Sequence, residues 1–263
     1  MRMLLYKAWI ETRMRFFAGL VAVTIVCTFY LQQHAWLVTM WSHELSDPKG
    51  YHFAWMPLGI NHFSWYLWHY LYDNYLQQVW SLFALLFAFG GLVRERSNGT
   101  ILFSLGLPVS RRRWLFSRLA VALIEAIAVA LFALIVIIVG SKIIHQDYSL
   151  GQLMLHTILM VAAGVILIAM GNLCYSLVPG NYTSLLVTLV VLGVPYLLLQ
   201  DYMQNQRDSH TTTWLQYFDV GHAMAGPWQI TWGSFPWVAV ACAWGLTGLF
   251  LLLTASYGDR IDY

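Results

Sequence analysis

Charged residues are scarce in this 263-residue sequence: Asp, Glu, Lys and Arg make up only 10% of it, whereas 59% is hydrophobic. A soluble domain carries about 25% charged residues, so this composition excludes a soluble globular protein and predicts an integral membrane protein. The length accommodates roughly six spans of about 20 residues each. The N-terminus has no short apolar core followed by a small-residue cleavage site, so we expect no signal peptide.

Recognisable catalytic motifs are also lacking. The sequence contains no GxxxxGK[ST] phosphate-binding loop and no Gly-x-Ser-x-Gly nucleophile setting. Its three cysteines, Cys27, Cys174 and Cys242, lie in apolar runs without a neighbouring base, which favours small buried hydrophobic side chains over a disulfide or a metal site. The chain is therefore expected to be no enzyme and to bind no cofactor, and any energy must come from a partner.

What the sequence does contain is a series of long apolar runs. They predict an all-α membrane protein, with 1–263 as a single transmembrane domain and no separate soluble domain. Residues 1–15 have the pattern of an amphipathic "elbow" helix lying along the membrane surface. The six expected spans are about 17–40, 75–93, 114–140, 152–177, 183–200 and 235–256.

Two long segments between spans, 41–74 and 201–234, are rich in Trp, Tyr and Phe. Such rings are favoured at the headgroup level of a bilayer, because they combine an apolar body with a polar edge. Helices at the membrane surface are the favoured interpretation, and a Trp/His-rich ligand pocket is the alternative.

The distribution of positive charge predicts the orientation. With the N-terminus inside, eleven Lys and Arg residues are cytoplasmic and only Lys49, Lys142 and Arg207 are outside. Cytoplasmic loops carry an excess of Lys and Arg, so we expect both termini in the cytoplasm of a multi-pass protein of the inner (plasma) membrane.

Polar residues inside the spans are few. Glu125 is the only acidic residue deep in a span, where it is either a coupling or substrate-contact residue or a carboxyl satisfied at a helix interface. Asn172 is a candidate polar partner for it. His156 lies in the fourth span, and ligation of a haem by two histidines would need a second one at similar depth, such as His34; interfacial hydrogen bonding is the favoured alternative.

A basic connection, RERSNGTILFSLGLPVSRRRWLFSR at 94–118, separates the second and third spans and holds six of the fourteen Lys and Arg residues. It resembles the first cytoplasmic loop of ABC-2 type transporter permeases. In that family a Glu–Arg pair is followed by a Gly-Thr step, a short coupling helix, here 100–107, and a Pro-x-Ser-Arg turn. The matching coupling residues within the loop 94–113 are Glu95, Arg96, Gly99, Thr100, Leu102, Leu105, Pro108 and Arg111.

The resemblance implies the membrane subunit of an ATP-driven exporter. It also implies a separate ABC ATP-binding subunit that binds ATP and Mg, and pairing of two permeases as a homodimer or heterodimer. Membrane lipids, and no nucleic acid, are the other expected partners. Two other functions stay open from the residues alone: a haem- or redox-carrying membrane subunit, and an intramembrane enzyme acting on lipids.

Overall fold

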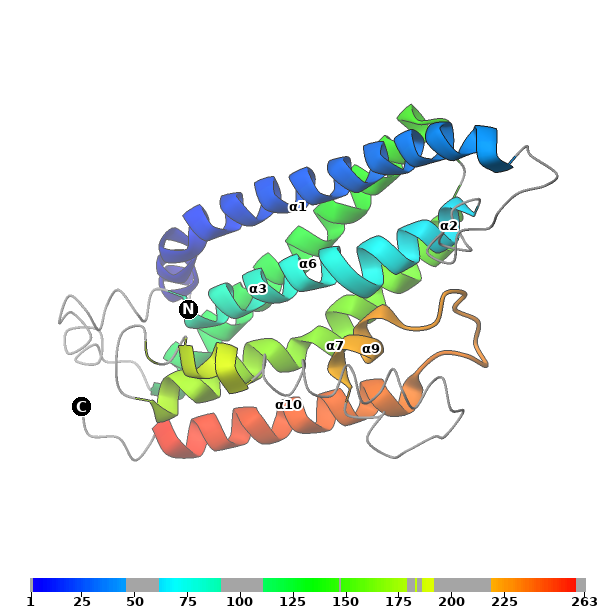
Figure 1. Cartoon of the computed structure of the whole chain (residues 1–263). Coiled ribbons are helices and arrows are strands. Elements are labelled where there is room, and N and C mark those ends of the chain that lie inside the picture. The colour runs from blue at the N-terminus through cyan, green and yellow to red at the C-terminus, as the bar shows by residue number, and fades with distance from the viewer. Residues whose placement is uncertain are drawn as a thin grey trace.

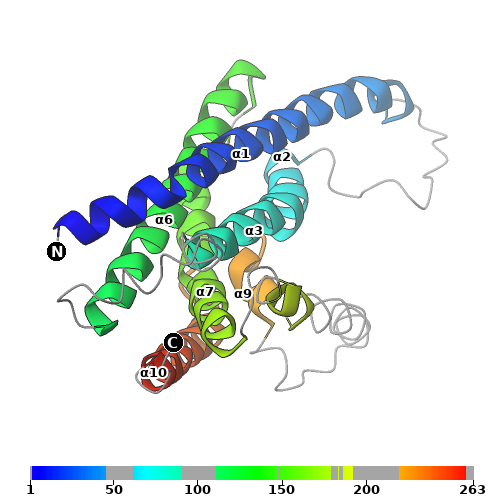
Figure 2. The same cartoon turned by 90° about the vertical axis from the view of Figure 1, so that its left-hand side faces the viewer.

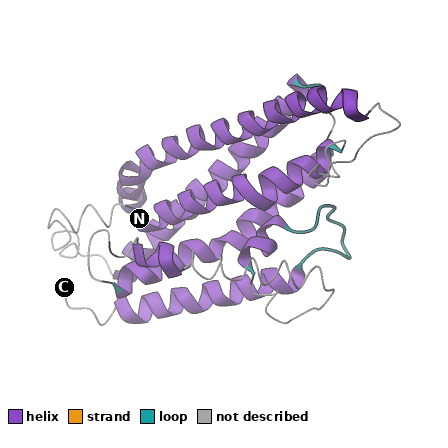
Figure 3. Cartoon of the chain, viewed as in Figure 1, coloured by secondary structure: helices purple, strands orange, loops and turns teal. Residues whose placement is uncertain are grey.

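The computed structural model describes residues 2–45, 62–90, 111–146, 148–178, 183, 186–191 and 219–258. Side chains are described for these residues except 41–45, 111, 112, 257 and 258. Within these ranges the protein is helical, with short turns and no strand (Figure 3). The coupling loop residues from Glu95 to Pro108 lie outside them, as do most of the expected fifth span and most of the segment 201–234.

Long helices form a bundle (Figure 1). The elements are α1 (Arg2–Leu45), α2 (Phe63–Tyr66), the π-helix η1 (Leu67–Tyr75), α3 (Leu76–Phe89), α6 (Arg111–Ile143), α7 (Leu150–Leu177), α9 (Val220–Ala225) and α10 (Trp237–Gly258). Among the described residues, four helices are long and apolar enough to cross a membrane: Arg2–Met40, Arg113–Ile143, Leu150–Leu177 and Trp237–Ser256.

Comparison with the expected spans shows agreement in some elements and differences in others. The helices α6 and α7 cover the expected spans 114–140 and 152–177, and α10 covers the expected span 235–256 from Trp237 onward. Residues expected to form a surface helix and a first span belong to one uninterrupted helix, α1, whose first turns are inclined to the rest (Figure 1). The expected span 75–93 overlaps a helical run that begins earlier, at Phe63, and continues through η1 to Phe89.

The helices are apolar on both their inner and outer sides. On α6, Ala126, Val129 and Ala130 are buried in the core, whereas Ile124 and Leu131 are exposed on the opposite side. Apolar side chains all around a helix are typical of a membrane span. Small inward-facing residues let neighbouring helices approach closely, which is how membrane helices associate without a hydrophobic driving force.

The helix ends are grouped at two opposite ends of the bundle. The start of α1, the end of α3, the start of α6 and the ends of α7 and α10 lie at one end, called the N-end here (Figures 1 and 2). The helix ends that flank residues 91–110 in the sequence, those of α3 and α6, both lie here. The short connection after Ile143 and the aromatic helix η1 lie toward the opposite, far end.

The π-helix η1 presents aromatic side chains to two neighbours. Toward α1, the Tyr66 hydroxyl just before η1 donates to the Tyr30 carbonyl at 3.1 Å, and the Tyr70 ring stacks on that of Tyr30 with centroids 6.2 Å apart. Toward α7, the Tyr72 hydroxyl is hydrogen-bonded to that of Thr157 at 3.1 Å. This part of the expected outer segment 41–74 therefore packs within the bundle.

Candidate functional site

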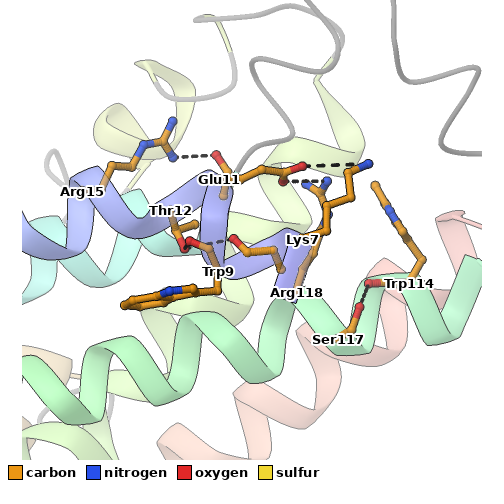
Figure 4. A network of polar contacts seen from close by, with 10 residues as sticks. Lys7, Trp9, Glu11, Thr12, Arg15, Trp114, Ser117 and Arg118 are labelled. Carbon is orange, nitrogen blue, oxygen red and sulfur yellow. Dashed lines mark hydrogen bonds and ion pairs between the residues drawn. The ribbon is translucent and has the colours of Figure 1, made fainter. Parts of the chain in front are cut away.

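Charged side chains of α1 and α6 gather at the N-end of the bundle (Figure 4). Glu11 and Arg15 are four residues apart on α1, and Arg118 and Glu125 are seven apart on α6. Each spacing places its two side chains on one face of the helix. Contacts between α1 and α6 show that these two faces are turned toward each other. With Thr12, these residues form what we call the charged clamp: Glu11, Thr12, Arg15, Arg118 and Glu125.

An ion pair joins α1 to α6. The Arg118 Nη2 lies 3.1 Å from Glu11 Oε2, and only 8% of the Arg118 side chain is exposed. The Arg118 guanidinium also lies 4.3 Å from the centroid of the Trp114 ring, and Lys7 approaches Glu11 at 3.9 Å. Removing one member of a buried ion pair leaves an uncompensated charge and costs about 3–5 kcal/mol. The pair therefore fixes the start of α6 against α1.

Glu125 lies deeper than this ion pair. Glu125 is 1% exposed, and its Oε1 is hydrogen-bonded to the hydroxyl of Thr12. That hydroxyl also lies 3.1 Å from the Ala8 carbonyl of its own helix. A hydroxyl both donates and accepts, so Thr12 can serve either a carboxylate or a carboxylic acid at this position.

Arg15 holds the end of α3. Its Nη1 donates to the Leu86 carbonyl at 2.8 Å and to the Gly90 carbonyl at 2.6 Å. The Gly90 amide donates to the Phe87 carbonyl at 2.9 Å, so it does not supply the usual helical bond to Leu86. A cation at a helix C-terminus both satisfies such carbonyls and interacts favourably with the helix dipole.

The clamp thus connects α1 to the two helix ends that flank residues 91–110. Arg15 holds the last turn of α3 on one side, and Arg118 holds the start of α6 on the other. The contact of Glu125 with Thr12 joins α1 to α6 further along that helix. Charge-assisted hydrogen bonds are short and directional. A displacement of the end of α3 or of the start of α6 would therefore also displace α1.

Asn172 and Glu125, which the sequence suggested as polar partners, make separate contacts in the structure. Asn172 is buried but donates to the Ile168 carbonyl of its own helix at 2.9 Å, so the suggested pairing with Glu125 is replaced by the contact with Thr12. Of the coupling residues, only Arg111 is placed, at the start of α6, and its side chain is not described.

His156 is fully buried in α7, and both ring nitrogens face backbone carbonyls. Nδ1 lies 3.0 Å from the Ala225 oxygen and Nε2 lies 3.3 Å from the Trp228 oxygen. His34, the other histidine considered for haem ligation, is buried against the rings of Phe63 and Tyr66. The geometry therefore favours hydrogen bonding for His156 over ligation of a haem.

Thr12, Glu11, Arg15 and Arg118 were not identified as site residues from sequence. The signal that could have found them is the charge pattern: acidic then basic four apart on α1, and basic then acidic seven apart on α6. Opposite charges on single faces of two apolar helices indicate that the helices pair through those faces.

Comparison with known proteins identifies the family of the chain. A sequence profile described as "ABC-2 family transporter protein" matches residues 21–256, which is most of the chain and includes both α6 and the loop before it. No curated protein matches the sequence at a significant level. The chain therefore belongs to the ABC-2 family of transporter proteins, as a transmembrane subunit.

Proposed function

We propose that this chain is the permease of an ATP-driven exporter and forms its translocation path. A separate ABC ATP-binding subunit hydrolyses ATP with Mg²⁺, and two permeases pair as a homodimer or heterodimer. Six spans place both termini in the cytoplasm, with residues 1–15 as the elbow helix. Family membership and the eleven-to-three excess of Lys and Arg on one side support this proposal.

The charged clamp is the observation that carries the proposal. In this proposal the N-end faces the cytoplasm, and residues 94–113 dock on the ATPase through Leu102 and Leu105. A movement of the loop displaces the end of α3 and the start of α6. The contacts of Arg15 and of Arg118 pass that displacement to α1, because packed helices joined by charged contacts move as units.

The two other functions find less support. Ligation of a haem by His156 is disfavoured by its two carbonyl contacts. Across the described ranges, no three His, Cys, Asp or Glu side chains are grouped as metal ligands. A lipid-acting enzyme needs clustered polar groups, whereas Glu125 and His156 belong to different networks, with Thr12 and with the segment after Asp219 respectively.

The test is co-purification of the full chain with a co-expressed soluble ABC ATP-binding subunit. Leu102→Asp with Leu105→Asp places charge where an apolar contact is proposed, and an unpaired buried charge costs several kcal/mol. We expect normal membrane insertion but loss of the ATPase. The matched control is Leu58→Asp with Ile60→Asp, an equally apolar pair in the segment 41–74, which the proposal places on the other side of the membrane. The ATPase should stay bound to this variant. Retention of the ATPase by the first variant would remove the proposed coupling element.

A further inference from the structure

Residues 219–230 form a segment that is bound by the rest of the bundle mainly through its backbone. The segment, called the cap segment here, comprises Asp219, the short helix α9 and the turn up to Ile230. It lies beside α7, part-way along the bundle (Figures 1 and 2). Side chains from three other elements reach its backbone, and we call them the cap-binding side chains: Trp68 of η1, Gln77 of α3, and Gln152 and His156 of α7.

The cap-binding side chains contact five carbonyls in a stretch of ten residues. Trp68 Nε1 donates to Gly226 at 3.0 Å, and Gln77 Nε2 donates to Gly221 at 2.8 Å. His156 contacts the carbonyls of Ala225 and Trp228. Gln152 makes a two-point contact with Ile230, donating to its carbonyl and accepting from its amide, both at 3.0 Å.

Apolar contacts complete the site. Met224 and Ala225 are fully buried, and Ile230 is 4% exposed. Gly164 near the middle of α7 provides the space: a Cβ there would lie 2.3 Å from Trp80 Cζ3 and 3.1 Å from Met224 Cε. Gly226 has φ +66°, and a Cβ there would lie 2.4 Å from Leu159 Cδ2. The contacted stretch, residues 221–230, contains no Asp, Glu, Lys or Arg, so the site holds a closely fitting peptide without an acidic or strongly basic side chain.

These contacts are of a kind that any peptide backbone could make. The cap-binding side chains hydrogen-bond to backbone carbonyl and amide groups, which every peptide has. Apolar residues around them pack against side chains such as that of Met224. A helix of six residues has little stability of its own, so α9 depends on the site that holds it. The buried charged side chains of the described residues, Arg118 and Glu125, belong to the clamp at the other end, so nothing here selects a charged ligand.

We propose that the cap-binding side chains form the far-side substrate site of the permease, that the cap segment occupies it in this resting structure, and that an uncharged, apolar peptide chain displaces the segment during export. The inference depends on the proposed function for its claim that the ligand is transported. The binding itself depends only on the residues described above. Backbone hydrogen bonds then provide affinity, and the apolar contacts provide selectivity, as in other sites that accept extended peptides.

The test is photo-cross-linking of the full chain in nanodiscs. The probe is a synthetic peptide with the sequence of residues 221–230, acetylated and amidated, carrying photo-methionine at the place of Met224. Gly226→Ala in the protein introduces the Leu159 clash and should release the cap segment, so we expect labelling of α7 near Gly164 to rise about fivefold or more. Gly233→Ala is the matched control, because a Cβ there meets nothing within 4 Å and labelling should stay at the wild-type level.

A second, milder variant guards against misfolding of Gly226→Ala. Met224→Ala shortens a buried apolar side chain of the cap segment and leaves every cap-binding side chain unchanged, so it weakens the segment but not the site and should also raise labelling. Adding Gln77→Leu to Gly226→Ala removes one donor to the peptide, and labelling should fall again. Maltoheptaose, an uncharged oligosaccharide, should not compete with the probe.

Three results would overturn the inference: no increase in labelling with either variant, labelling that is insensitive to Gln77→Leu, or competition by maltoheptaose as strong as that by unlabelled peptide. The experiment contains no ATPase. A chain that binds the peptide but fails to co-purify with the ATPase would therefore refute the proposed function and leave the peptide site standing, and the reverse result would do the opposite.

Discussion

Replacement of Arg15 tests the clamp most directly. The Arg15→Met variant keeps much of the length of the side chain but removes both hydrogen bonds to the last turn of α3, at 2.8 and 2.6 Å. A hydrogen bond to a charged group contributes about 1.5–3 kcal/mol when its loss leaves a buried partner unsatisfied. The site is only half-buried, so water can replace part of what is lost. We therefore expect the free energy of unfolding to fall by about 2–3 kcal/mol.

Two further variants make this measurement specific. Arg15→Lys keeps the charge but loses the planar guanidinium, so a smaller loss of about 1–2 kcal/mol is expected. Arg13 is exposed on the same helix, two residues earlier, and Arg13→Met should stay within about 0.5 kcal/mol of the wild type. Comparing these two positions separates the contact with α3 from a general effect of removing positive charge near the membrane.

The assay is equilibrium unfolding in mixed micelles of dodecylmaltoside and SDS, followed by far-UV circular dichroism. The ATPase activity of the complex with its ATP-binding subunit is the second readout. If the clamp passes motion from the loop to α1, Arg15→Met should lower that activity while the subunits stay bound. Unfolding of Arg15→Met indistinguishable from that of the wild type, or equal losses in Arg15→Met and Arg13→Met, would refute the reasoning.

Two other substitutions probe the interior of the bundle. Glu125→Gln preserves the shape of the side chain and a hydrogen bond with Thr12 but removes ionisation, so expression should persist while the ATPase activity of the complex falls several-fold; unchanged activity in both Glu125→Gln and Glu125→Ala would indicate a purely structural carboxyl. Gly164→Ala should lower the free energy of unfolding by about 1–3 kcal/mol, because its Cβ would lie 2.3 Å from the rigid Trp80 ring, whereas Gly245→Ala on α10, with nothing within 4 Å, should be neutral when both are measured by the same micelle assay.

Helices made of uninterrupted apolar runs could be predicted from the sequence. The residues of α6, α7 and α10 have enough apolar length to span a bilayer, and their ends lie close to the expected boundaries. The helical run starting at Phe63 was harder to predict, because Tyr, His, Asp and Asn interrupt its apolar residues. Its π-helical stretch also removes the 3.6-residue period that sequence patterns rely on.

The contacts of the site could be predicted only in part. The position of Glu125 in an apolar helix indicates that the carboxyl needs a partner, but not that this partner is Thr12, 113 residues earlier. Periodicity shows which face of a helix a residue occupies, whereas the identity of the facing helix depends on the packing of the whole bundle. The same holds for His156, whose carbonyl partners belong to a segment with no strong pattern of its own.

The π-helix η1 has a consequence for how residues are counted along this helix. Hydrogen bonds from residue i to i+5 take up more residues per turn than the 3.6 of an α-helix, so the nine residues Leu67–Tyr75 span a shorter length and a different rotation than nine α-helical residues would. A related chain that is α-helical throughout this stretch would place the equivalents of Phe63 and Trp80 in the same positions with fewer residues. An alignment of the two chains would then require its gap inside a buried helix, where insertions are ordinarily least tolerated, and not in the loops on either side.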